Sequence, residues 1–145
     1  MHRVLKEYLS GVDTSQFWEY GVQDVDGDGT GELLLFVGGN LTRIVTVRDG
    51  EAVPLLEGSC LYLCGSGRIE QWGEGAGGET RAYYRVENQK AVPEQTLVYQ
   101  WNEDQWYRSV GSDGSLISIS FEEQQQITDL YPRKDVPTMP ISNIR

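Results

Sequence analysis

Three aspartates and a glutamate lie within one short glycine-rich stretch of this sequence, DVDGDGTGEL at residues 24–33. Asp24, Asp26 and Asp28 alternate with other residues, so their carboxylates can converge on one centre. Calcium takes about six to eight oxygen ligands at roughly 2.3–2.6 Å, which neighbouring carboxylates can supply. Gly29 permits a sharp bend that a Cβ atom would obstruct, after which the carbonyl of Thr30 can turn inward. The predicted ligands are Asp24, Asp26, Asp28, Thr30 and Glu32.

The spacing of these residues differs from that of an EF-hand. An EF-hand carries a bidentate glutamate at position 12 of its loop, and counting from Asp24 places Leu35 there, with Glu32 at position nine. The apolar run 33–37 and the aromatic-rich segment 17–23 predict strands rather than long flanking helices. We therefore expect a strand, a calcium loop and a second strand. The alternative is an Asp-Gly turn without an ion, in which the clustered carboxylates would repel one another.

The segment YGVQDVDGDGTGELLLFVG, residues 20–38, resembles the D-x-D-G-D-G-x-x-[DE]-L calcium loop of the FG-GAP type in integrin-like β-propellers. It also resembles the Y-x-x-x-D-x-D-G-D-G-x-x-E-L-L segment of uncharacterised secreted or lipid-anchored proteins of Gram-positive gut bacteria. The resemblance implies that the side chains of the first, third, fifth and ninth positions and the carbonyl of the seventh bind calcium. Glu32 replaces the aspartate of the integrin-type loop and has a longer arm. The likeness is confined to these residues.

The composition favours a mainly β fold. The chain of 145 residues suits one domain with its own core, and its 17 glycines and many aromatic residues are typical of β-rich proteins. We expect a β-rich α+β domain over residues 1–132, built of antiparallel meander or propeller-like sheets. A short helix is predicted at 3–10 and a second after Ser120. Residues 133–145 are predicted to form an extended or flexible tail. The chain is too short for a complete seven-bladed propeller.

Further strands are predicted by alternating or short apolar runs at 41–47, 52–56, 60–64, 80–86, 97–101, 106–110 and 116–120. The glycine-rich segment 65–78 is predicted to be a mobile surface loop. Part of it fits G-x-G-x-x-G, but no helix pattern follows, so it does not predict a nucleotide site. In the C-terminal helix, Ser120 and Glu123 form a capping box. The residues expected to dock this helix on the sheet are Phe121, Ile127, Leu130 and Tyr131.

The formal net charge of −10 argues against nucleic acid and anionic membranes as partners. No stretch reaches the roughly eighteen apolar residues of a membrane span, and the first residues lack the apolar core of a signal peptide. Either the protein is cytoplasmic or its export signal lies outside this sequence. Because cytosolic calcium is scarce, we expect an extracellular or cell-surface location, with the cytoplasm as the alternative.

Catalysis has few candidate residues. His2, at the terminus, is the only histidine, so Ser-His-Asp and Cys-His mechanisms lack their base. The carboxylates of Glu70, Glu74, Glu103 and Asp104 could serve glycoside hydrolysis, although solvated loop charges explain them as well. We therefore predict a non-catalytic, lipoprotein-like secreted or cell-surface domain with a structural calcium loop. Aromatic rings beside carboxylates would suit glycan or protein binding. The alternative is a carboxylate-dependent, carbohydrate-active hydrolase.

Overall fold

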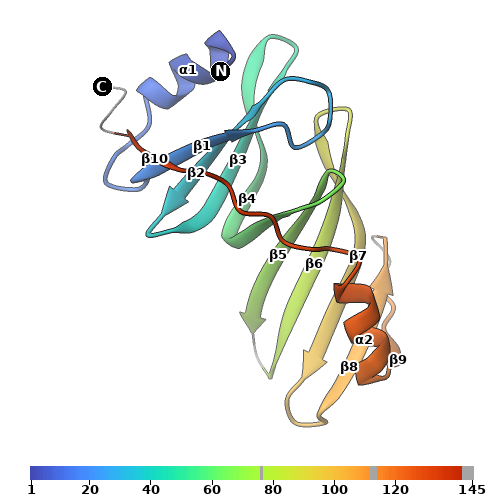
Figure 1. The fold of residues 1–145 in the computed structure, drawn as a ribbon. Helices are drawn as coiled ribbons and strands as arrows, with labels where there is room; N and C mark the ends of the chain where they lie inside the picture. The colour runs from blue at the N-terminus through green and yellow to red at the C-terminus, as the bar shows by residue number, and fades with distance from the viewer. Residues whose placement is uncertain (76, 112–113, 142–145) are drawn as a thin grey trace.

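The computed structural model describes residues 1–75, 77–111 and 114–141, and its main feature is one antiparallel sheet (Figure 1). Ten strands follow one another in the order β10-β1-β2-β3-β4-β5-β6-β7-β8-β9. The strands are β1 (Glu19–Gln23), β2 (Glu32–Val37), β3 (Asn40–Arg48), β4 (Glu51–Cys64), β5 (Arg68–Gly75), β6 (Gly78–Glu87), β7 (Lys90–Gln100), β8 (Gln105–Val110), β9 (Ile117–Ile119) and β10 (Met139–Pro140). The helices are α1 (Arg3–Ser10) and α2 (Phe121–Thr128). The mainly β meander with a helix near each end is confirmed.

Strand β5 corrects the prediction of a mobile loop over residues 65–78. Residues 68–71 pair with β4 on one side, and residues 68–75 pair with β6 on the other. Ile69 and Glu70 are both buried, whereas the two glycines of β5 and its glycine-rich flanks hide this short pattern in the sequence. Residue 76 lies outside the described residues. Gly73 and Gly75 belong to the strand because they pair with β6, so that pairing, rather than intrinsic propensity, fixes their backbone.

Strand β2 is buried on both faces and forms the centre of the N-terminal half of the sheet. Leu33 and Leu35 point to one face, where they pack in a cluster with Leu5 and Leu9 of α1. The intervening side chains, including Leu34, point to the opposite face and join a second cluster. This arrangement follows from the two-residue alternation of a strand combined with cover on both sides. The loop that precedes β2 is therefore attached to the most buried strand of the protein.

Helix α2 covers the C-terminal half of the sheet. Its predicted capping box is present, with the Glu123 amide donating to the Ser120 hydroxyl at 3.1 Å. The prediction that Phe121 and Leu130 dock the helix is wrong, because these side chains are 62% and 68% exposed. Tyr131 packs inward instead, with its ring stacked on that of Tyr83 at a centroid distance of 3.9 Å. The helix ends at Thr128, so Leu130 and Tyr131 lie beyond it, and the helical spacing assumed for them does not apply.

Residues 132–141, here called the strap, run from α2 back along the sheet to its opposite edge (Figure 1). The Lys134 amide donates to the Leu63 carbonyl at 2.9 Å. The Ile141 amide donates to the Trp18 carbonyl at 3.0 Å. Ile141 is 1% exposed and belongs to the cluster under α1. The strap thus connects the two halves of the domain, and Met139–Pro140 adds the edge strand β10 beside β1.

Gly21 in β1 is required for the close approach of the strap. A Cβ atom at Gly21 would lie 2.9 Å from the Pro137 carbonyl oxygen and 3.1 Å from a Val136 methyl carbon. Gly21→Ala should therefore displace the strap and lower the free energy of unfolding by about 1–3 kcal/mol, measured by urea denaturation. Gly65→Ala is the matched control, because a Cβ atom there meets no atom within 4 Å. Equal stability of the two variants would contradict this role of Gly21.

Candidate metal centre

The acidic loop connects β1 to β2, so the predicted order of strand, loop and strand is confirmed. Gln23 ends β1 and pairs with Glu32, the first residue of β2. Between them the chain turns through Gly27 and Gly29, whose φ angles are +77° and +89°. This left-handed region is readily adopted only by glycine. The loop therefore has a backbone that its glycines permit, and no helix flanks it.

Backbone amides of the loop hold its aspartate side chains in place. The Asp24 carboxylate accepts hydrogen bonds from the amides of Gly27 and Gly29, each at 2.9 Å. The Asp28 amide donates to Asp26 at 3.1 Å, and the amide two residues further on donates to Asp28 at 2.8 Å. Short side-chain-to-backbone bonds of this kind are typical of Asx turns. They orient the three carboxylates before any ion binds.

Glu32 supplies the fourth carboxylate from within the protein. Its residue is 2% exposed, and its Oε1 atom accepts from the amides of Val25 at 2.9 Å and Asp26 at 3.3 Å. Within the described ranges, no hydrogen bond or ion pair to Oε2 is found. A buried carboxylate with an unengaged oxygen is costly unless a cation or donor compensates it. Glu32 therefore has one oxygen that anchors the loop and one that remains for a ligand.

The four carboxylates form one cluster. Asp24, Asp26, Asp28 and Glu32 each offer an oxygen atom, and these atoms all lie within 4.8 Å of one another. Calcium–oxygen distances of roughly 2.3–2.6 Å place two oxygens on opposite sides of the ion about 4.6–5.2 Å apart. The spacing of the cluster therefore fits a shell around a single ion. The prediction from the sequence that these four side chains come together is confirmed, and they could hold a metal ion.

The pKa values in the cluster reflect burial and repulsion. Burial, with added repulsion from Asp26 and Asp28, raises the pKa of Glu32 to about 7. Burial also raises the pKa of Asp26, whereas the Gly29 amide is the main cause of a lowered pKa at Asp24. Carboxylates that crowd together resist simultaneous ionisation unless a positive charge is present. A bound cation would relieve this repulsion.

Thr30 and His2 lie at the same site. Thr30 lines a pocket of about 200 Å³ together with Asp28 and Glu32, and His2 lines its other side. The Nδ1 atom of His2 accepts from the Val4 amide at 3.1 Å and caps α1. The Thr30 carbonyl stays a predicted fifth ligand. Sequence reasoning missed the position of His2 beside the loop, although its place directly before a predicted helix could have indicated a cap.

The carboxylates considered for hydrolysis lie in different surroundings. Glu70 is 2% exposed and accepts from the Nε atom of Arg133 at 3.0 Å. Glu103 and Asp104 each accept a hydrogen bond from a tyrosine hydroxyl. Glu74 is exposed in β5. Three of the four are thus already engaged by neighbouring side chains.

Comparison with protein-family models, with curated proteins and with solved structures found no match to this chain. Among the described residues, neither helix has the length and apolar character needed to cross a membrane.

Trp18 and Trp101 are the exposed tryptophans of the described chain, one before β1 and one in the β7–β8 turn. The acidic cluster is therefore the site whose geometry points most directly to a ligand.

Proposed function

We propose that this chain is a non-catalytic, secreted or cell-surface β domain that binds calcium in its β1–β2 loop. The observation that carries the proposal is the convergence of four carboxylates, whose ligand atoms lie within 4.8 Å of one another. Side chains that offer only oxygen favour calcium over zinc, which prefers nitrogen and sulfur ligands. Magnesium requires shorter bonds and near-octahedral geometry and usually keeps several waters. A shell of about six to eight oxygens, supplied by the loop and by water, suits calcium better.

The role of the ion in this proposal is to stabilise the hairpin. Asp24 lies directly after β1 and Glu32 begins β2, so one ion would join the ends of two paired strands. Val25, between the first two ligands, is buried in the cluster on the second face of the sheet. Fixing the loop would therefore also fix a residue of the core. An ion that binds the folded loop and not the unfolded chain stabilises the fold by linkage.

Two further parts of the proposal rest on chemistry alone. Weak calcium sites stay filled where calcium is abundant, which favours an extracellular or cell-surface setting. The exposed rings of Trp18 and Trp101 are suited to contacts with a glycan or a protein. Such a module would bind its partner while calcium maintains the scaffold.

The test is the melting temperature of the protein with excess calcium and with EDTA. Calcium at about a hundred times its dissociation constant should stabilise the fold by about 3 kcal/mol, which raises the melting temperature by roughly 6–12 °C. EDTA should reverse the rise. The variant Asp26→Ala, Asp28→Ala should lose the response, because two of four carboxylates are gone.

The matched control is Glu51→Ala, Glu74→Ala, which removes the same charge at exposed positions in β4 and β5. This control should keep the full response to calcium. A melting temperature that is independent of calcium would end the proposal. A response that the loop variant and the control retain equally would show that calcium acts elsewhere on the acidic surface.

A further inference from the structure

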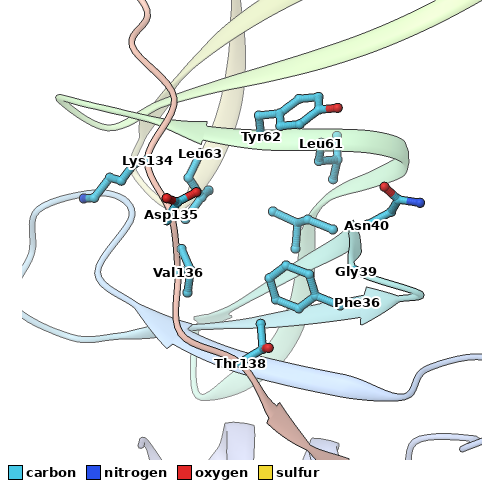
Figure 2. Close-up of a pocket in the computed structure, with 11 residues that line it drawn as sticks. Phe36, Gly39, Asn40, Leu61, Tyr62, Leu63, Lys134, Asp135, Val136 and Thr138 are labelled. Carbon is cyan, nitrogen blue, oxygen red and sulfur yellow. The ribbon is translucent and has the colours of Figure 1, made fainter.

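A hollow of about 410 Å³ lies between the strap and the sheet, away from the acidic loop (Figure 2). The sheet contributes Phe36 from β2, the first residues of β3 and the segment Leu61–Leu63 of β4. The strap contributes Lys134–Val136 and Thr138. The volume falls in the range of about 300–1,000 Å³ that is usual for small-molecule sites. The hollow is therefore large enough to hold a ligand.

The floor of the hollow is apolar and belongs to the protein core. Phe36, Leu41, Leu61 and Leu63 line it and are each at most 8% exposed. All four are members of the same buried cluster, and Val136 of the strap packs against that cluster. A ligand seated on this floor would remove from water the small apolar area that these side chains and the half-buried Val136 still expose, which stabilises binding in proportion to the area covered. The floor therefore selects an apolar body.

The strap gives the hollow one carboxylate without a partner. In the part of the chain that the structure describes, no hydrogen bond or ion pair to the Asp135 side chain is found. Figure 2 shows the Asp135 side chain on the strap where it crosses the sheet, whereas the neighbouring Lys134 amine extends away from the hollow. A second acidic group lies near the rim, because the Thr138 hydroxyl donates to Glu19 at 3.0 Å. Asp135 and Lys134 are the charged residues that line the hollow, and of these two the carboxylate is the group that faces it (Figure 2).

We propose that this hollow binds ligands that combine an apolar or aromatic body with a protonated amine. The apolar floor would receive the body, and the Asp135 carboxylate would accept a charge-assisted hydrogen bond from the amine. The net charge of −10 adds a long-range attraction for cations and disfavours anionic ligands. No predicted metal ligand lines this hollow, so the proposal is independent of the calcium site.

The experiment is a titration of the whole chain followed by methyl NMR spectra, with 2-phenylethylamine and the neutral 2-phenylethanol as probes. Both should shift the methyl signals of Leu41, Leu61 and Val136, because both carry the same ring. The amine should bind about two- to fivefold more tightly, the range expected for a charge pair at a partly solvated mouth. Equal affinity of amine and alcohol, or shifts confined to other residues, would overturn the proposal.

Asp135→Asn tests the role of the carboxylate. Asp135 is exposed, so its amide variant should fold, and the affinity for the amine should fall to that for the alcohol while the alcohol is unaffected. Glu51→Gln is the control, because it removes the same charge from an exposed position ten residues before Leu61 in β4. An equal loss of amine affinity in both variants would mean that only the overall charge matters and would contradict a specific contact.

A protonated amine next to an apolar group could come from a small amine or from a lysine side chain in a peptide. A third titration therefore uses a blocked peptide with one lysine between two leucines, and a control peptide with norleucine in place of the lysine. Tighter binding of the lysine peptide than of 2-phenylethylamine would identify a peptide source, and the reverse order would identify a small amine. Either order supports the proposal, provided that the norleucine control binds more weakly. Absence of binding by both amines would overturn it.

Discussion

Arg133→Met should lower the free energy of unfolding by about 1–3 kcal/mol, because it removes the half-exposed cation that pairs with the buried Glu70 carboxylate. Glu70 is 2% exposed, and the Nε atom of Arg133 donates to it at 3.0 Å. The Nη2 atom of Arg133 donates to the same oxygen. The guanidinium also lies 3.6 Å from the centroid of the Tyr62 ring. Methionine keeps an apolar contact with the ring but removes the charge, so the loss combines the unpaired carboxylate with the cation–π contact to Tyr62.

Urea denaturation of the single and double variants measures this effect. Glu70→Met, Arg133→Met should recover most of the lost stability, because replacing both members of a buried ion pair with apolar groups is often nearly neutral. The pair joins β5 to the strap across 63 positions of sequence. A single variant as stable as the wild type, or a double variant no better than the single one, would show that the ion pair does not hold the strap.

Glu32→Gln should separate the structural role of Glu32 from its proposed role as a metal ligand. The amide oxygen of glutamine can still accept from the Val25 and Asp26 amides, as Oε1 of Glu32 does. In EDTA the variant should therefore be at least as stable as the wild type at neutral pH. With calcium at about a hundred times its dissociation constant, the wild type should gain about 3 kcal/mol and the variant much less, because a neutral amide replaces a charged ligand.

Chemical denaturation in EDTA and in calcium provides these four values. Glu32→Ala is the informative companion, because it removes the acceptor as well and leaves buried amides unsatisfied. It should lose about 1–3 kcal/mol even in EDTA. A calcium response in Glu32→Gln equal to that of the wild type would contradict the assignment of Glu32 as a ligand.

The metal-free wild type should also show a pH dependence that Glu32→Gln lacks. Burial raises the pKa of Glu32 from 4.5 to about 7 in the folded protein. A raised carboxylate pKa means that the folded state holds the proton more tightly than the unfolded chain does. The contribution of Glu32 to stability is therefore full below about pH 4.5 and is lost as the pH rises through about 7. Denaturation in EDTA across this range measures it, and parallel curves for the two proteins would contradict it.

The acidic cluster could be predicted because its members are consecutive in the chain. Asp24, Asp26 and Asp28 are separated by single residues, so local backbone geometry alone brings them together. The strands on either side of the loop could be predicted as well, because a short apolar run such as 33–37 is typical of a buried strand, and this run lies in β2. The burial of Glu32 could not be inferred, because it depends on the tertiary packing around β2 and not on the local spacing of the loop.

The strap could not be predicted, because its contacts join residues that are distant in sequence. Residues 133–145 carry no periodic pattern, and yet Ile141 enters the core under α1 and Arg133 pairs with Glu70. Strand β5 escaped prediction for a related reason: its glycines resemble a loop until pairing partners on both sides are known. The hollow at Asp135 exists only where the strap crosses the sheet, so no local sequence signal indicates it.

The most direct test of the proposed calcium site is isothermal titration of chelator-treated protein with calcium. We expect binding of one ion per chain, with loss of that binding in Asp26→Ala, Asp28→Ala and weaker binding of magnesium. The Glu51→Ala, Glu74→Ala control should bind as the wild type does. Absence of saturable binding, or equal affinity in the loop variant and the wild type, would contradict the assignment of the β1–β2 loop as a calcium site.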